Sequence, residues 1–121
     1  MKQFEYRIYD SVYKDMITGK KTIEFRLLNE KSSQIKIGDE IKFSVINNEE
    51  KHLLVEVTNL YIYNNIEELW NSKEIITNHL NYTKDEFINT FYQIFGKEKV
   101  TNSQIIGIEF IIKKKEENRN E

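Results

Sequence analysis

The residues best suited to chemistry lie in one short run, Gly19-Lys20-Lys21-Thr22-Ile23-Glu24-Phe25-Arg26. This run combines a turn residue, two ammonium groups, a carboxylate and a guanidinium with only two apolar side chains. In an extended strand, successive side chains point to opposite faces. The apolar residues then share one face, and the other face carries the polar ones, Thr22, Glu24 and Arg26. We therefore expect a strand whose polar face holds the functional groups.

Glu24 and Arg26 lie two residues apart, so their side chains can contact the same ligand or each other. A mutual ion pair on a solvated strand would contribute only about 0 to 1 kcal/mol and would indicate no function. In a cleft, Arg26 would offer planar donors to a phosphate or a base edge, while Glu24 would accept from an exocyclic amine or orient the guanidinium. The sequence leaves both interpretations open.

Lys20 and Lys21 follow a predicted helix. Cations are favourable there because the last backbone carbonyls of a helix carry partial negative charge. The functional alternative is that one of the two lysines contacts a phosphate or takes part in proton transfer. Lys21 has the strand phase of Ile23 and Phe25. It therefore reaches Glu24 only if the chain bends where the helix meets the strand.

Aromatic side chains are a second kind of candidate. Tyr61, Tyr63, Trp70 and Tyr92 could supply a surface on which an unpaired base stacks, an interaction worth about 1 to 3 kcal/mol per base. The alternative is that these residues belong to the hydrophobic core, as aromatics at helical spacing usually do. Tyr92 joins the motif residues as a predicted ligand contact.

The composition limits the class of protein. A chain of 121 residues fits one domain, and the absence of cysteine excludes disulfides, thiolate metal sites and cysteine nucleophiles. His52 and His79 stand 27 residues apart without carboxylates at metal-ligand spacing, so we expect neither a metal nor another cofactor. A bilayer-spanning helix needs about 20 apolar residues, and no segment approaches that length. We therefore expect a soluble, cytoplasmic protein without membrane contacts.

The distribution of charge bears on the class of partner. A formal charge of −2 argues against indiscriminate binding to phosphate backbones, because such binding depends on many Lys and Arg contacts. Residues 14–42 nevertheless hold seven Lys or Arg and five Asp or Glu, whereas residues 43–112 hold five and ten. A modest basic region therefore contains the motif, although interspersed charges can also serve only to keep a small domain in solution.

Apolar spacing predicts strands around one helix in the first half of the chain. The predicted elements are strand 4–8, helix 9–17, strand 22–27, strand 41–45 and strand 53–57. Asp10 or Ser11 would cap the helix, and Gly19 would end it. Residues 47–51 are predicted to connect the last two strands, and a shift in the apolar alternation predicts a bulge near Thr58.

The second half is predicted to be helical, with a closing strand near its end. Asn64 and Glu67 would cap a short helix, and Thr83 with Glu86 would form the capping box of a longer one that Gly96 ends. The remaining predictions are a final strand over 105–112, one domain over 1–112 and a charged, disordered tail over 113–121. These elements predict the α+β class, with a small curled β-barrel and flanking helices.

The motif and its surroundings resemble the ASCH domain. Residues 19–26 match the pattern G-x-K-T-x-E-x-R, and residues 35–39 match the I-x-x-G-D that follows it. The resemblance spans residues 3–112. It implies a PUA-like fold, which is related to modules that recognise RNA or modified bases.

The resemblance also implies a ligand cleft beside the motif strand. Lys21, Glu24 and Arg26 would line this cleft, with Lys20 and Thr22 as neighbours, and the implied partner is RNA or a nucleotide-like ligand. Some members have been linked to RNA cleavage. Another branch hydrolyses acetylated cytidine with a lysine, a threonine three residues later and a distant glutamate. Lys21 takes the lysine position, while Glu24 stands where that branch has its threonine nucleophile.

Three functions follow from these observations. The leading hypothesis is a small RNA- or nucleotide-binding module. The alternative is a hydrolase acting on RNA or an acylated nucleoside, in which Lys21 and Glu24 transfer protons and Arg26 stabilises negative charge. Candidates for its distant glutamate are Glu67, Glu68 and Glu74. The third function is a protein-interaction adaptor that uses exposed aromatic residues.

Overall fold

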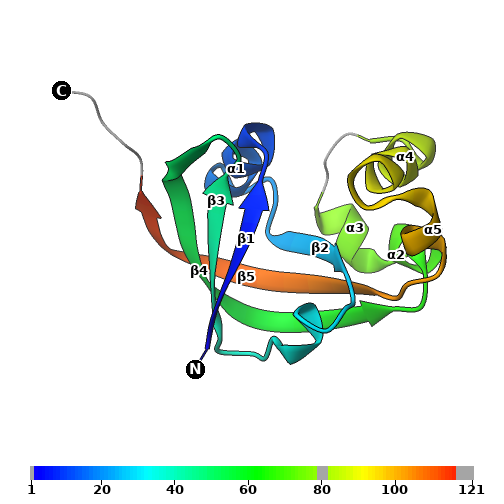
Figure 1. The fold of residues 1–121 in the computed structure, drawn as a ribbon, viewed down its shortest axis with the longest axis horizontal. Coiled ribbons are helices and arrows are strands. Elements are labelled where there is room, and N and C mark those ends of the chain that lie inside the picture. The colour runs from blue at the N-terminus through cyan, green and yellow to red at the C-terminus, as the bar shows by residue number, and fades with distance from the viewer. Residues whose placement is uncertain (1, 79–81, 117–121) are drawn as a thin grey trace.

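The computed structural model describes residues 2–78 and 82–116. Five strands form one sheet in the order β1-β3-β4-β5-β2 (Figure 1). Their bounds are Gln3–Ile8 for β1, Ile23–Leu27 for β2, Glu40–Val45 for β3, Asn48–Tyr63 for β4 and Ile105–Glu116 for β5. β1 runs parallel to β3, and the other neighbouring pairs are antiparallel. The sheet is therefore mixed, with β1 and β2 at its two ends.

The sheet curls until its two end strands approach each other. Arg26 on β2 donates from its guanidinium to the carbonyl oxygen of Arg7 on β1 over 2.8 Å, and the ammonium group of Lys31 donates to the carbonyl oxygen of Glu5. No strand ladder joins β1 to β2 within the described ranges. Two cationic side chains therefore bridge the open side of a half-barrel. The predicted α+β class with a curled sheet and flanking helices is confirmed.

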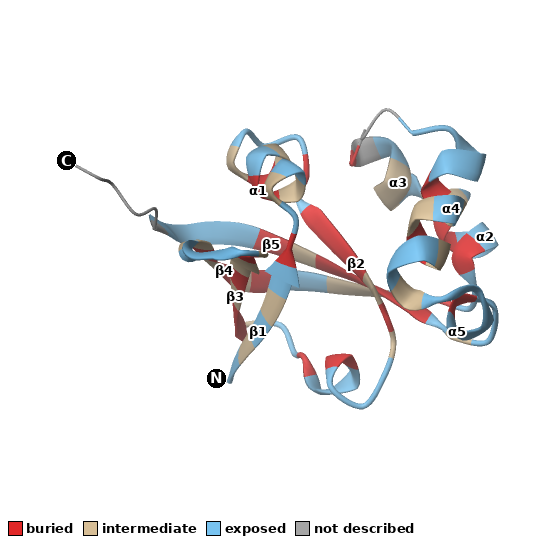
Figure 2. Ribbon diagram, turned by 45° about the horizontal axis from the view of Figure 1, so that its top comes forward, coloured by how far each residue is buried: buried red, intermediate tan, exposed pale blue. Residues whose placement is uncertain are grey.

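The helices gather at two places (Figures 1 and 2). Their bounds are Asp10–Ile17 for α1, Ile66–Trp70 for α2, Lys73–Thr77 for α3, Lys84–Phe95 for α4 and Lys97–Thr101 for α5, with a 3-10 turn at Ser32–Gln34. Buried side chains form two hydrophobic clusters. The first contains Tyr13 of α1 and joins it to β1, β3 and the first part of β4, and the second contains Phe25, Tyr63 and Phe87. The helices α2, α3, α4 and α5 form what we call the helical lobe. None of the helices in the described part of the chain has the length and hydrophobicity needed to cross a bilayer.

β2 lies between α1 and the helical lobe, and its two faces carry different kinds of side chain. Ile23, Phe25 and Leu27 are buried in the second hydrophobic cluster, which joins β2 to the helical lobe. Glu24 and Arg26 lie on the opposite face and turn toward α1 and β1. Figure 2 shows β2 running between α1 and the helical lobe. The alternation predicted from the motif is therefore confirmed, and both of its faces have a packing role.

β4 changes hydrophobic cluster halfway along its length. Val57 belongs to the first cluster, whereas Tyr63 belongs to the second. The pairing of β4 with β5 shifts register between Val57 and Asn59, which leaves Thr58 as the extra residue. The bulge predicted near Thr58 is confirmed. It allows one strand to bury side chains in both clusters.

Two expected caps are wrong and one is confirmed. Asp10 does not cap α1, because its carboxylate pairs with Lys14 and Lys51, and the N-cap position belongs to Tyr9. The short helix α2 is capped by Asn65, the residue after the predicted one. The capping box of α4 is confirmed, since the Thr83 hydroxyl accepts from the Glu86 backbone and the Glu86 carboxylate accepts from the Thr83 backbone. Caps are hard to place because neighbouring polar side chains compete for the same backbone groups.

Two boundaries also differ from the predictions. β4 already begins at Asn48, because Asn47 adopts a positive φ of 67° and turns the chain within fewer residues than expected. β5 continues to Glu116, past the predicted boundary at 112, because Lys114 and Lys115 pair with Leu54 and Leu53 of β4. The first residues of the predicted tail are therefore strand, and residues 117–121 lie outside the described residues.

Gly107 on β5 allows an aromatic pair to pack closely on the backbone. A Cβ atom at this position would lie 3.2 Å from Cε1 of Phe25 and 3.3 Å from Cε2 of Tyr63. Both rings are buried in the second hydrophobic cluster, so they have little room to move. A side chain at Gly107 would therefore overpack this cluster.

We expect Gly107→Ala to lower the free energy of unfolding by about 1 to 3 kcal/mol, because the new methyl group forces the two rings apart. Urea denaturation followed by circular dichroism measures this change. A variant as stable as the parent chain would show that the rings move aside without cost.

Candidate functional site

The chain bends sharply between α1 and β2, and this bend positions Lys21. Gly19 adopts a positive φ of 79°, a conformation that a side chain would strain. The backbone N–H of Lys21 then donates to the carbonyl oxygen of Asp15 over 3.0 Å, which folds the loop back onto the helix. As a result, Nζ of Lys21 lies 3.2 Å from Oε1 of Glu24. The structure therefore contains the bend that Lys21 needs in order to reach Glu24, which the sequence had left open.

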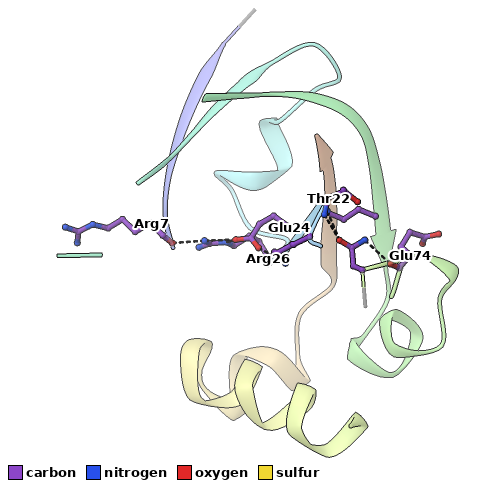
Figure 3. Close-up of polar contacts among 8 residues, drawn as sticks. Arg7, Thr22, Glu24, Arg26 and Glu74 are labelled. Atoms are coloured by element: carbon purple, nitrogen blue, oxygen red, sulfur yellow. Dashed lines mark hydrogen bonds and ion pairs between the residues drawn. The ribbon is translucent and has the colours of Figure 1, made fainter. Parts of the chain in front are cut away.

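Asn78 fixes the start of β2 from the side of the helical lobe. Its side-chain oxygen accepts from the backbone N–H of Thr22 over 2.8 Å and from that of Ile23 over 2.9 Å. Its side-chain nitrogen donates to the carbonyl oxygen of Glu74 (Figure 3). Asn78 is buried, so these bonds replace contacts with water. Sequence patterns did not indicate Asn78, because a single asparagine at the end of a short helix shows no spacing from which its partners could be predicted.

Glu24 lies between two cations. Its Oε1 faces Lys21, and its Oε2 lies 2.9 Å from Nη2 and 3.0 Å from Nε of Arg26. Only 7% of the Lys21 side chain, 8% of Glu24 and 19% of Arg26 is exposed. Figure 3 shows Arg26 between Glu24 and the carbonyl group of Arg7. We call Lys21, Glu24 and Arg26 the ion triad.

Glu24 is ionised in the folded chain. Burial favours the neutral acid, but the charges of Lys21 and Arg26 and the hydrogen bonds from both outweigh burial and hold the pKa of Glu24 below its ordinary value. Both carboxylate oxygens are occupied by these cations. The role of Glu24 is therefore to hold Lys21 and Arg26 in place.

Tyr6 supports Arg26 from the side of β1. The guanidinium carbon of Arg26 lies 4.6 Å from the centre of the Tyr6 ring, and Nζ of Lys31 lies 4.0 Å from it. These are cation–π distances. Burial raises the pKa of the Tyr6 hydroxyl, which has no hydrogen-bond partner within the described residues. Arg26 is therefore held by a carboxylate, a carbonyl oxygen and an aromatic ring.

Lys21 is less fully engaged than Arg26. An ammonium group has three N–H donors, and in the part of the chain that the structure describes, Glu24 is the only carboxylate that pairs with Nζ of Lys21. The same nitrogen lies 5.3 Å from the centre of the Phe25 ring. Lys21 therefore keeps donors available for a ligand.

The ion triad forms one end of a cavity of about 210 Å³ between α1 and α4. Apolar side chains of α4 line the opposite wall: Phe87, Phe91, Ile94 and Phe95. α1 contributes Ser11, Val12 and Asp15. Tyr9 and Tyr82 also line the cavity and are 53% and 46% exposed, so they lie where it meets solvent. The cavity thus combines a charged end, an aromatic wall and two exposed tyrosines.

The structure brings together some of the predicted ligand contacts and separates others. Lys21, Glu24 and Arg26 all line the cavity. Lys20 and Thr22 are exposed and lie outside its lining, although the Thr22 backbone bonds to Asn78. Tyr92 is half-buried on α4, outside the lining, and its ring faces Lys97. Ligand contact by any of these residues stays a prediction.

The other aromatic candidates have structural partners. The Tyr61 hydroxyl donates to Glu109, the Tyr63 hydroxyl donates to Glu74, and Trp70 packs against the Phe87 ring. The exposed tyrosines of the cavity are instead Tyr9 and Tyr82, which were not among the residues predicted from the sequence. Both lie just before a helix, where sequence spacing does not show which surface they face.

The glutamates proposed for a catalytic role also have partners. Glu67 pairs with Lys84, and Glu68 accepts from the Asn64 backbone. Glu74 accepts from the Tyr63 hydroxyl over 2.6 Å, and none of these three glutamates lines the cavity. Residues 2–78 and 82–116 contain no group of three or more residues suited to holding a metal ion. His79 lies outside the described residues.

Comparison with known proteins gives structural relatives only. No protein-family model and no curated protein matches the sequence. The crystal structure of hypothetical protein PH0355 is similar, with a TM-score of 0.78, 28% identity and coverage of 92% of this chain and 99% of that one. The solution structure of PF0455 from Pyrococcus furiosus has a TM-score of 0.69 and 24% identity, and covers 91% of this chain and 96% of that one.

Two ASCH structures are also similar. ASCH from Zymomonas mobilis has a TM-score of 0.64 and 12% identity, with coverage of 96% of this chain and 73% of that one. The ASCH domain from Lactobacillus crispatus JV V101 has a TM-score of 0.63 and 11% identity, with coverage of 91% and 79%. The chain therefore has an α+β fold with a curled, mixed sheet. More specifically, it has the ASCH-like fold that the motif predicted.

We expect Glu24→Gln to lower the free energy of unfolding by about 3 to 5 kcal/mol, because it leaves the buried Lys21 and the half-buried Arg26 without a carboxylate. Urea denaturation at neutral pH measures the loss. Glu49→Gln is the matched control, because Glu49 pairs with Arg7 where both side chains are 66% exposed, and it should cost about 0 to 1 kcal/mol. Equal effects of the two variants would contradict the structural role of the ion triad.

The contribution of Glu24 should also depend on pH in one direction. Its pKa is lower in the folded chain than its ordinary value of 4.5, so on acidification the unfolded chain binds the proton first. Its stabilisation is therefore fully present above that ordinary value and is lost as the pH falls through the folded pKa. The stability difference between the parent chain and Glu24→Gln, measured in urea at several pH values, should shrink below about pH 4.5. A constant difference would contradict this assignment.

Proposed function

We propose that this protein is a small cytoplasmic RNA- or nucleotide-binding module that takes an unpaired base into the cavity between α1 and α4. The observation that carries the proposal is the ion triad, in which Lys21 and Glu24 are buried and which forms the polar end of a cavity with an aromatic wall. The ASCH-like fold supports the same class of function.

A nucleobase is complementary to such a cavity. Its flat faces are apolar enough to pack against aromatic side chains, and its edge carries donors and acceptors. Phe87 and Phe91 offer the aromatic surface, while Lys21 and Arg26 offer donors at the opposite end. Tyr9 and Tyr82 are exposed where the cavity meets solvent and can stack on a base or sugar. Ligand sites commonly have this form, a mostly apolar hollow with a few placed polar groups.

The charge of the whole chain favours one exposed nucleotide over a long strand. Proteins that track a phosphate backbone neutralise many phosphates with Lys and Arg, and their affinity falls steeply with salt. This chain has a formal charge of −2. We therefore expect a local recognition event with a weak dependence on salt.

Binding is favoured over hydrolysis by the state of Glu24. A general base must accept a proton from the reacting group, but both oxygens of Glu24 already contact Lys21 and Arg26. Their charges also hold the pKa of Glu24 low against the effect of burial, which weakens it as a base. A carboxylate also makes a different intermediate from the hydroxyl nucleophile of the acetylcytidine-hydrolysing branch.

We expect Lys21→Met to reduce the affinity for short single-stranded RNA of mixed sequence by about tenfold or more, because a charge-assisted hydrogen bond contributes about 1.5 to 3 kcal/mol. Isothermal titration calorimetry measures the affinity. Lys99→Met is the matched control, since Lys99 is exposed on α5 and lies outside the cavity.

Two outcomes would contradict the proposal. Equal affinities of the parent chain and a folded Lys21→Met variant would show that the cavity is not the binding site. Formation of a cleaved RNA, or of cytidine from acetylated cytidine, by the parent chain but not by Lys21→Met would show that the site is catalytic. Chromatography of the same incubations detects these products.

A further inference from the structure

Asp15 is a cavity-lining carboxylate that the ion triad does not include. It lies near the C-terminal end of α1, is half-buried and faces the cavity. Within the described residues, no cation pairs with its carboxylate and no N–H group donates to it. Only its backbone carbonyl oxygen is used, by Lys21 and Thr18. Its backbone is therefore fixed while its acceptor oxygens stay available.

The position of Asp15 is unfavourable for folding. Negative charge near the C-terminus of a helix is repelled by the backbone carbonyls there. Partial burial without a partner adds a loss of hydration. A group that costs stability and faces a cavity is suited to a ligand that restores its hydrogen bonds.

Glu24 cannot provide this acceptor, because its two oxygens already contact Lys21 and Arg26. The expectation that Glu24 accepts from an exocyclic amine therefore transfers to Asp15. Five charged side chains line the cavity. The cations Lys21 and Arg26 balance the carboxylates of Glu24 and Asp15, and the third cation, Arg7, pairs with Glu49. The cavity thus suits a neutral ligand that presents a donor to Asp15 and an acceptor to Lys21.

We infer that Asp15 is a specificity residue of the cavity and that the ligand is a nucleobase carrying an amino group beside an acceptor. Cytosine has this edge, whereas uracil presents a carbonyl oxygen where cytosine has its amino group. A carboxylate accepts from the cytosine amino group, and Lys21 would donate to O2, the carbonyl oxygen that cytosine and uracil share. Against uracil, Asp15 would face another acceptor with no proton between them. This inference rests on the proposed function of the cavity.

The test compares cytidine 5′-monophosphate with uridine 5′-monophosphate, which differ in this part of the base edge. We expect the parent chain to bind the cytidine compound about tenfold more tightly. Asp15→Asn should bring the ratio of affinities to about one or reverse it, because an amide can also donate to uracil. NMR titration of the protein gives both affinities.

Two further variants separate specificity from general effects. Asp85→Asn is the matched control, since Asp85 is exposed on α4 and lies outside the cavity lining, so it should keep the parent ratio. Lys21→Met should weaken both nucleotides by a similar factor and keep the preference. Asp15→Asn should melt at or above the temperature of the parent chain, because it removes a half-buried unpaired charge.

The outcomes distinguish this inference from the proposed function. If both nucleotides bind in a Lys21-dependent manner but without a preference, or with a preference that survives Asp15→Asn, the assignment of Asp15 is overturned while the binding module stands. If neither nucleotide nor RNA binds, the proposed function itself is overturned. Asp15→Asn that unfolds would contradict the claim that Asp15 is kept for binding at a cost in stability.

Discussion

The ionised carboxylate of Glu24 holds two cations that would otherwise repel each other in a buried site. Charges are tolerated inside proteins only where ion pairs and hydrogen bonds offset the loss of hydration. Lys21 and Arg26 each depend on Glu24 for that compensation. The bend after α1, the strand β2 and the edge of β1 must therefore be placed together, because each carries one part of this arrangement.

The same side chains connect stability with the proposed function. Arg26 closes the half-barrel through the Arg7 carbonyl and the Tyr6 ring, and it also lines the cavity. Asn78 joins the end of α3 to the start of β2, and Phe25 on β2 packs against Phe87 on α4. The second contact connects the strand of the ion triad to the aromatic wall of the cavity. A cavity built in this way needs little rearrangement to bind a rigid ligand such as a base.

Features that depend on neighbours in the sequence were predicted well. The alternation of β2, the capping box at Thr83 and the bulge at Thr58 follow from side-chain period and local hydrogen bonds. Asp10 was wrongly expected to cap α1, because Lys51, distant in sequence, binds its carboxylate. Asp15 was not predicted as a site residue, because the cavity that it lines is formed by elements distant from it in the sequence.

The sequence by itself determined the class of fold and the strand that carries Lys21, Glu24 and Arg26, because periodicity and turn residues act over short distances. Only the tertiary structure decided that Lys21 reaches Glu24, that the ion triad borders a cavity and that α4 supplies its opposite wall. These contacts join segments far apart in the chain. Their geometry follows from how the half-barrel curls and where the helical lobe packs, and no local pattern encodes that.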